Sequence, residues 1–384
     1  MGKLMDFQIS DEQKQILDSV NRFIDRHLPL DEQIRRDEQF DPPYHLLKLM
    51  AEGGFLALPF SEKYGGLESG WDTVALVQEE MGRKGWMAGS LFNRAVGFGG
   101  MSLVAYGSET QKSELMPKLI NEGLLFALGL TEPQAGSDAS AIITRARKKQ
   151  DRWLINGLKT WISDAKEADF IVTVVRTEEG SVGHDGLSIL LIPKGTRGVR
   201  FSSLPKLGNN VLPSYEVSFD NAEVPLESLM GEEGRGFAHL MSTLHYARAG
   251  MAAATTGAAQ RAIDLTLDHV KNRQQFGRPI GKFQVIQHKL ADMQMRVDQS
   301  RMTSWHLAWL IREGLPARRN AAQAKVIATE ALQFVTRQGM QMLASTGYMD
   351  GNELQRLWRD AQLYSFGEGS NEIQRNIIAK ELGL

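Results

Sequence analysis

Residues 126–138, with the sequence Phe-Ala-Leu-Gly-Leu-Thr-Glu-Pro-Gln-Ala-Gly-Ser-Asp, mark a change in the hydrophobic pattern of the chain. Before them, from about residue 10, apolar residues such as Ile16, Val20 and Phe23 recur every three or four positions, which predicts helices. After them, short runs rich in Val and Ile are bounded by Asn-Gly and Asp-Gly turns, which predicts strands. We therefore expect an N-terminal helical domain over residues 1–125 and a central β domain over residues 126–237.

The helical pattern returns after Gly236. Residues Phe283, Ile286, Leu290 and Met293 follow one another by three or four positions, which predicts one buried stripe of a long helix. The segment 250–259 before it is rich in Gly and Ala, and such small residues allow helices to pack closely. Residues 238–384 are therefore predicted to form a C-terminal helical bundle, which makes the whole chain a multidomain α+β protein.

The composition is that of an ordinary globular enzyme-sized chain. Its 384 residues are 42% hydrophobic and carry 44 Lys and Arg against 46 Asp and Glu, so no broad basic field favours nucleic acid as a partner. No apolar run is long enough to span a bilayer, and we expect no membrane insertion. The absence of cysteine excludes disulfides, thiolate catalysis and iron-sulfur clusters. The first ten residues resemble neither a secretory signal nor a transit peptide, which favours a cytoplasmic location.

The common motifs for nucleotides, zinc and serine hydrolysis are missing from the sequence. No G-x-G-x-x-G follows a predicted strand, and neither H-E-x-x-H nor G-x-S-x-G occurs. Residues 277–282 resemble a phosphate-binding loop only faintly, because Phe283 stands where Ser or Thr would bind magnesium. We therefore expect no metal site.

Two polar segments lie in the predicted β domain. In residues 129–138, the hydroxyls of Thr131 and Ser137 suit a loop that binds a planar or phosphorylated ligand, although an ordinary turn is an equal alternative. In residues 159–163, Trp161 is suited to stack on an aromatic ligand and Ser163 to hydrogen-bond it, although a lone tryptophan is more often a core residue.

Two further segments lie in the predicted bundle. Residues 273–281 form a basic loop between two long helices, in which Arg273 is suited to bind a pyrophosphate; a solvated loop is the alternative. In residues 358–372, Glu368 lies between Gly367 and Gly369 in a break between two helices. Flanking glycines let a backbone carry a carboxylate into a cleft, although most loop glutamates are simply solvated.

Together, in this order and at these distances, the four segments resemble the acyl-CoA dehydrogenase family over essentially the entire chain. The matching motifs are Thr-Glu-Pro-x-x-Gly-Ser-Asp, Trp-Ile-Ser, Arg-x-x-Phe-Gly with Gln284 and 290–293, and Arg359-Asp360 with Glu-Gly-Ser. The resemblance implies a helical domain, a β-barrel domain and a four-helix bundle. It also implies FAD bound between the subunits of a homotetramer, an acyl-CoA substrate in fatty acid or branched acyl-CoA metabolism, and electron-transferring flavoprotein as the electron acceptor.

The resemblance also implies roles for individual residues. Glu368 corresponds to the base that removes the α-proton while the β-hydride passes to flavin N5, which yields the trans-2-enoyl-CoA. The residues implied to bind the flavin ring are Leu130, Thr131, Trp161 and Ser163, with Ser137 beside both flavin and substrate. The neighbouring subunit is implied to hold the rest of FAD through Arg273, Phe276 and Gln341, with Ser370 and Glu372 completing the site. The substrate contacts are implied to be Ser137, Arg248, Gly367 and Gly369.

The sequence departs from the family pattern at several of these places. Ala344-Ser345 replaces a Gly-Gly pair, His245 replaces an Asp, and Gly367 replaces a Tyr. Ala247 occupies the alternative base position and cannot accept a proton. The small residues Gly367 and Ala247 make a branched or cyclic acyl group as compatible as a straight one, unless Gly367 serves only the turn. Two rival functions remain, a flavin oxidase or monooxygenase on the same fold and a catalytically silent acyl-CoA-binding protein.

Overall fold

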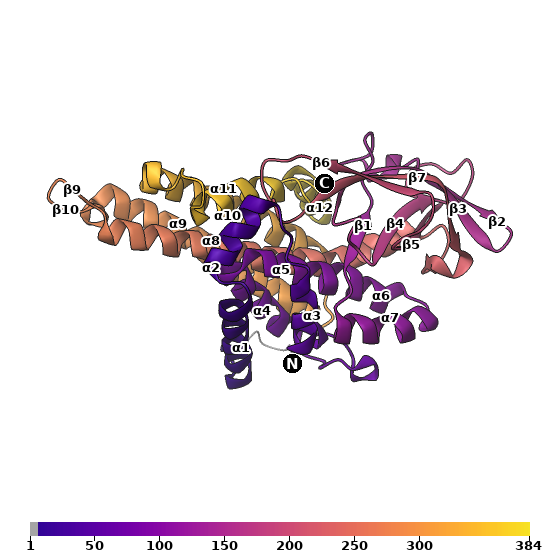
Figure 1. Cartoon of the computed structure of the whole chain (residues 1–384), viewed down its shortest axis with the longest axis horizontal. Coiled ribbons are helices and arrows are strands. Elements are labelled where there is room, and N and C mark those ends of the chain that lie inside the picture. Colours follow the sequence, from indigo (N-terminus) through magenta and orange to yellow (C-terminus); the bar gives the residue numbers. More distant parts are fainter. Residues whose placement is uncertain (1–6) are drawn as a thin grey trace.

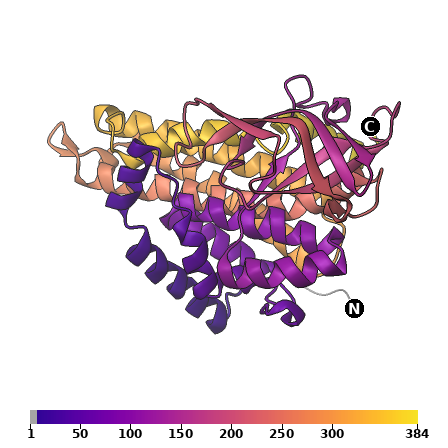
Figure 2. The same cartoon turned by 45° about the vertical axis from the view of Figure 1, so that its right-hand side comes forward.

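The computed structural model describes residues 7–384, whose helices and strands fall into three groups (Figure 1). Long helices run through the molecule, the sheet lies at one end of them, and the N-terminal helices lie along one side (Figure 2). The predicted order of helical, β and helical regions is confirmed. The boundaries at residues 125 and 237 stay predictions, because one hydrophobic core continues from the N-terminal helices into the strands.

In the described residues, the N-terminal group contains seven α-helices, one π-helical segment and two short 3-10 helices, Phe55–Ala57 and Glu62–Tyr64. Its first helix begins at Ser10, whose hydroxyl accepts a hydrogen bond from the Gln13 amide while the Gln13 side chain accepts one from the Ser10 amide. These two hydrogen bonds form a capping box at the start of α1. The elements are α1 (Asp11–His27), α2 (Leu30–Gln39), α3 (His45–Glu52), α4 (Trp71–Lys84), α5 (Trp86–Asn93), the π-helix Arg94–Gly100, α6 (Met101–Tyr106) and α7 (Glu109–Glu122).

The central region is a single eight-stranded sheet. The strands β6-β7-β3-β2-β4-β5-β8 are neighbours in this order, and β1 pairs in parallel with β4. Strand β4 is buried along its length because it lies between β1 and β5, which agrees with its continuous apolar run. The strands are β1 (Phe126–Gly129), β2 (Arg145–Lys149), β3 (Arg152–Ser163), β4 (Phe170–Arg176), β5 (Leu187–Pro193), β6 (Val199–Leu204), β7 (Ser214–Pro225) and β8 (Leu229–Met230).

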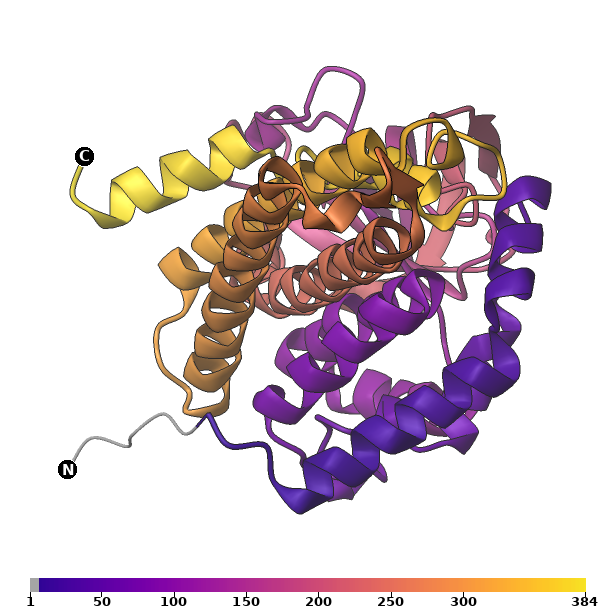
Figure 3. The same ribbon diagram turned by 90° about the vertical axis from the view of Figure 1, so that its left-hand side faces the viewer.

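The C-terminal region is a helical bundle around a helix of 37 residues. A short hairpin joins its first two helices and lies at the end of the molecule opposite the sheet (Figure 1). The last helix, α12, extends away from the bundle (Figure 3). The elements are α8 (Gly236–Asn272), β9 (Gln274–Gln275), β10 (Arg278–Pro279), α9 (Gln284–Arg312), α10 (Arg318–Leu343), α11 (Glu353–Tyr364) and α12 (Asn371–Glu381).

The small residues of α8 allow contact between helix backbones, as predicted, but the closest partner is α4 of the N-terminal region. A Cβ atom added to Gly257 would lie 1.9 Å from the Glu79 carbonyl oxygen, and one added to Gly82 would lie 2.1 Å from the Ala254 carbonyl oxygen. Close packing of α4 on α8 therefore joins the N-terminal helices to the bundle.

The predicted stripe on α9 is partly wrong, because Phe283 precedes the helix as its N-cap.

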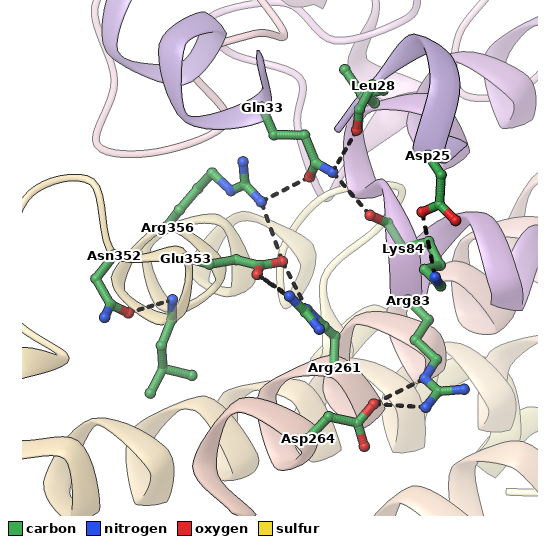
Figure 4. Close-up of polar contacts among 11 residues, drawn as sticks. Asp25, Leu28, Gln33, Arg83, Lys84, Arg261, Asp264, Asn352, Glu353 and Arg356 are labelled. Carbon is green, nitrogen blue, oxygen red and sulfur yellow. Dashed lines mark hydrogen bonds and ion pairs between the residues drawn. The ribbon is translucent and has the colours of Figure 1, made fainter. Parts of the chain in front are cut away.

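A buried polar network joins α2 to the bundle (Figure 4). The Gln33 amide donates to the backbone carbonyls of Leu28 and Lys84 and accepts from Arg356 Nη2 at 3.0 Å. Glu353 in turn pairs with Arg261 at 2.7 Å and with Arg356 at 3.5 Å. Because each buried charge has a polar partner, the network holds α2 and α8 against α11.

The Arg359-Asp360 pair of the sequence motif connects all three regions. Arg359 forms an ion pair with Asp37 of α2, and Asp360 accepts a hydrogen bond from the backbone amide of Asn209 before β7. Within residues 7–384, no helix is long and apolar enough to cross a membrane.

Candidate active site

Glu368 lies in the turn between α11 and α12, as the glycine pattern predicts. Its backbone adopts the left-handed conformation, with φ 56°, and Gly369 follows with φ 87°. A Cβ atom added to Gly369 would lie 2.7 Å from Gln374 Nε2, so a larger residue would crowd the turn. Gly367 has more room, because an added Cβ atom would meet only the Leu363 carbonyl oxygen, at 3.3 Å.

Side chains from two helices hold the backbone of this turn. Gln374 Nε2 donates to the carbonyls of Glu368 and Gly369 at 3.3 and 3.1 Å. Arg248 Nη2 of α8 donates to the Glu368 carbonyl at 3.5 Å, which is a long hydrogen bond. Ser370 caps α12 by accepting from the Ile373 amide. The turn is thus fixed from α8 and α12 together.

The carboxyl group of Glu368 is buried, although part of the residue remains accessible. Its Oε2 atom has no hydrogen-bond partner among the described residues. Burial raises the pKa of Glu368 to about 7, against the opposing effect of the positive charges of Arg248 and Lys325. The alternative of a solvated loop glutamate is therefore wrong, and the group has the properties of a base that works near neutral pH.

Arg248 is the buried cation of α8 beside this turn. It is only 6% exposed, and burial lowers its pKa, while the charge of Glu368 acts in the opposite direction. His245, one turn earlier, packs against Tyr246, and burial lowers the pKa of its imidazole. Ala247 is fully buried, and its carbonyl accepts from Asn93 Nδ2 at 3.1 Å.

The side chain of Trp161 is exposed on the surface of the β domain, so the alternative of a core tryptophan is wrong. The residue lies at an irregularity in β3, has φ 60° and is 51% exposed. The neighbouring Thr160 amide donates to the Thr131 carbonyl at 2.9 Å, which brings residues 130–131 beside the tryptophan. An exposed indole is free to stack on a planar ring.

A buried ion pair supports this part of the β domain. The Lys159 ammonium donates to the Leu130 carbonyl at 3.0 Å and to Glu132 Oε1 at 2.8 Å. Glu132 also accepts from the amides of Ile143 and Thr144. The pair therefore fixes the loop that carries Leu130 and Thr131 onto β3.

The end of β3 is linked to the turn that carries Glu368. Asp164, which follows Ser163, is fully buried between Arg94 of the π-helix and the Tyr44 hydroxyl, and its amide donates to the Pro213 carbonyl. The Tyr364 hydroxyl, at the end of α11, donates to Asn209 Oδ1 at 2.9 Å. Residues 209–213 therefore connect the two groups of predicted site residues.

Three predicted site residues lie elsewhere. Arg273 ends α8, 25 residues after Arg248, which corresponds to about 38 Å along the helix. Phe276 is 92% exposed on the hairpin of β9 and β10, and Gln341 is exposed in the last turn of α10. One chain therefore does not bring these residues to Trp161. Ser137 is exposed in its loop, and Glu372 is exposed in the first turn of α12.

A small cavity lies one to two helical turns from Arg248. Apolar residues dominate its lining. Most of the lining comes from the π-helix, β1 and α8, with Ser102 of α6 and Val172 of β4 completing it.

Sequence reasoning missed Lys159, Asp164 and Lys325. Lys325 carried a usable signal, since it lies at helical spacing from Ala321 and Ala328 on an otherwise apolar face of α10. Among the described residues, no group of three His, Cys, Asp or Glu side chains is arranged to hold a metal ion.

The three-part fold places a buried carboxyl group in the helical bundle and an exposed indole in the β domain. Models of the acyl-CoA dehydrogenase N-terminal, middle and C-terminal domains match residues 10–123, 127–222 and 234–383, so the chain belongs to the acyl-CoA dehydrogenase family. The chain is thus an FAD-dependent oxidoreductase of this family, and the exposed Trp161 fits the flavin ring, because its indole is free to stack on one.

Relatives and solved structures cover nearly the whole chain. The chain is 36% identical to the Probable acyl-CoA dehydrogenase YngJ of Bacillus subtilis, over 98% of this chain and 100% of that protein. It is 34% identical to the glutaryl-CoA dehydrogenase of Desulfococcus multivorans, over 98% and 97% of the two chains. The structure of a glutaryl-CoA dehydrogenase with glutaryl-CoA is similar with a TM-score of 0.94, 34% identity and 99% and 97% coverage. The prolyl acyl carrier protein oxidase AnaB is also similar, with a TM-score of 0.93, 29% identity and 98% and 100% coverage.

Proposed function

We propose that this protein catalyses the FAD-dependent α,β-dehydrogenation of an acyl-CoA thioester to the trans-2-enoyl-CoA, with Glu368 as the base. The observation that carries this proposal is the buried Oε2 atom of Glu368, which has no hydrogen-bond partner among the described residues. A carboxylate in that state is free to accept a proton from a substrate carbon. Its pKa of about 7 keeps a large fraction ionised at neutral pH while making it a stronger base than a solvated carboxylate.

The remaining residues of the turn hold the base and the substrate. Arg248 and Gln374 fix the carbonyl groups around Glu368, so that the carboxyl group keeps one direction. Gly367 and Gly369 leave space for the thioester beside the base, and Ser137 would contact it from the β domain. The apolar residues of α8, the π-helix and β1 that line the small cavity would contact the acyl chain.

FAD would bind with its ring against Trp161, Thr131, Leu130 and Ser163, and it supplies the hydride acceptor when bound. Arg273 lies at the end of α8 where the hairpin of β9 and β10 begins, and this hairpin is at the end of the molecule opposite the sheet whose strand β3 carries Trp161 (Figure 1), which supports a site shared by two subunits. Arg273, Phe276 and Gln341 of a second copy would then hold the adenosine and pyrophosphate part, with the flavin site completed by Ser370 and Glu372. A homotetramer is the assembly that this arrangement favours.

Electron-transferring flavoprotein is the proposed electron acceptor. A chain from the structural work on the electron transferring flavoprotein of Acidaminococcus fermentans is similar to this one with a TM-score of 0.95, 33% identity and 98% and 99% coverage. The cytoplasmic location stays a prediction from the sequence.

A flavin oxidase is the second candidate, which the similarity to the oxidase AnaB favours. Fast reaction of the reduced flavin with oxygen would identify an oxidase. A silent acyl-CoA-binding protein would show no turnover with any acyl-CoA. The unpaired carboxyl group argues against such a protein, because burying it without a role costs stability.

The test is a screen of acyl-CoA thioesters with an artificial electron acceptor, using the wild type and Glu368→Gln. The variant should lose turnover by about a hundred- to ten-thousand-fold but keep FAD and acyl-CoA binding, since its shape is nearly unchanged. Glu114→Gln is the matched control, because Glu114 is exposed on α7 away from the site. Near-normal turnover of Glu368→Gln would place the base elsewhere.

A further inference from the structure

Lys325 of α10 is a fully buried lysine beside the turn that carries Glu368. Its exposed fraction is 0%, and its neighbours on the same face of the helix are Ala321, Ala328 and Thr329. Within residues 7–384, no carboxylate forms an ion pair with it. A lysine is almost never fully buried without a paired charge, because removing an ammonium group from water is costly. Its place in the fold therefore needs an explanation other than packing.

The ammonium group of Lys325 binds both ends of the turn. Its Nζ atom donates to the Ser365 carbonyl at 3.1 Å and to Asn371 Oδ1 at 2.8 Å. The backbone amide of Asn371 also donates to the Ser365 carbonyl at 2.8 Å, and Thr329 Oγ1 donates to the side-chain oxygen Oδ1 of Asn371 at 3.2 Å. Because Ser365 follows α11 and Asn371 opens α12, the lysine closes the loop on which Glu368 is carried.

The charge of Lys325 also acts on the carboxyl group of Glu368. The two cations that stabilise the ionised form are Arg248 from α8 and Lys325 from α10. Burial lowers the pKa of Lys325 to about 8, while the charges of Glu368, Glu372 and Glu330 act against this and that of Arg248 acts with it. Lys325 is therefore still mostly charged at pH 7, where Glu368 would work.

We propose that Lys325 is a positioning residue for the catalytic base: it ties both ends of the turn together and supplies one of the two positive charges that favour the ionised Glu368. This inference rests on the proposed function, in which Glu368 is the base. A purely structural clamp would need the hydrogen bonds of Lys325 but not its charge, and this difference can be measured.

The experiment compares the pH dependence of kcat/KM in the FAD-loaded wild type, K325M and K325R. The acid limb of the profile reports the ionisation of the base in the free enzyme. Loss of the positive charge in K325M should move this limb to higher pH by about one unit and lower kcat/KM at pH 7 by about fivefold. K325R keeps the charge, so its limb should stay near that of the wild type even if its maximal rate falls.

Two further variants separate the charge of Lys325 from its hydrogen bonds. T329V removes a hydrogen bond to the same Asn371 side chain without changing any charge, so its acid limb should not move. K325Q keeps a hydrogen-bond donor without the charge and carries the test if K325M does not accumulate with FAD. N371D leaves Lys325 in place but gives it a carboxylate partner, so its limb should also move to higher pH.

The proposed role of Lys325 would be overturned if the acid limb did not move in K325M or K325Q. If neither of these variants folds, an unmoved acid limb in N371D would overturn it. Failure of the proposed function has a different signature, because Glu368→Gln would then retain turnover. If Glu368→Gln is inactive and the limb is unmoved, only the positioning role fails.

Discussion

Replacing Glu368 with glutamine should make the stability of the protein less dependent on pH. Burial raises the pKa of this carboxyl group from its ordinary value of 4.5 to about 7, against the positive charges of Arg248 and Lys325. Between these pH values the folded chain holds a proton that the unfolded chain has lost. The free energy of unfolding of the wild type should therefore fall as the pH rises from about 4.5 to 7. Glutamine has no such proton, so this contribution disappears from the variant.

The size of the effect follows from the pKa change. The raised pKa of Glu368 corresponds to about 3 kcal/mol of destabilisation above pH 7, of which about 2.5 kcal/mol develops between pH 5 and pH 8. A chain of 384 residues has an unfolding entropy of about 0.8 kcal/mol per kelvin, so this difference corresponds to about 3 °C in melting temperature.

Differential scanning calorimetry at pH 5 and pH 8, with excess FAD, measures the effect. The melting temperature of Glu368→Gln minus that of the wild type should be about 3 °C larger at pH 8 than at pH 5. The change between the two pH values is the readout, because the buried amide adds a cost that does not depend on pH. Glu114→Gln, at an exposed position, should show a constant difference. A constant difference for Glu368→Gln as well would refute the raised pKa.

Three further predictions concern other parts of the site. Ala344→Gly should raise the melting temperature by about 1 °C, because Ala344 is held at φ 52° and ψ −133°, where strain of about 1–3 kcal/mol exceeds the cost of glycine. Ala258→Gly, inside buried α8, is the control and should lower the melting temperature. A lower melting temperature for Ala344→Gly would contradict the inference that Ala344 is strained. Arg273→Ala should lower the FAD content per subunit and loosen the oligomer in analytical ultracentrifugation; full FAD content in a stable tetramer would count against a shared site. Gly367→Tyr should reduce kcat/KM for α-branched acyl-CoAs more than for linear ones of equal length, since an added side chain would enter space beside Glu368; equal losses would exclude selective crowding.

The departure at Ala344 shows how the fold can keep a conformation that the sequence does not favour. The sequence replaces a glycine pair by Ala344-Ser345, which put the backbone path there in doubt. The structure nevertheless gives Ala344 a positive φ, because α10 must end there before the chain returns as α11. Packing of the bundle therefore outweighs the local strain.

The sequence predicted the elements that depend on neighbours along the chain. Helical periodicity located α1 and α9, apart from Phe283, which precedes α9, and the glycines around Glu368 located the turn between α11 and α12. Each of these signals acts over a few residues, through backbone conformation or one turn of a helix. They could therefore be recognised without knowledge of the fold.

Only the tertiary structure decided the electrostatic state of these residues. The pKa of Glu368 depends on burial and on Arg248, which precedes it by 120 residues, and on Lys325 of another helix. The exposed Trp161 and the buried Lys159 lie two residues apart in β3, and an irregularity in the strand separates their environments. Desolvation and Coulomb interactions depend on distances through space, so the sequence could name the candidate base, whereas only the folded chain could show what surrounds it.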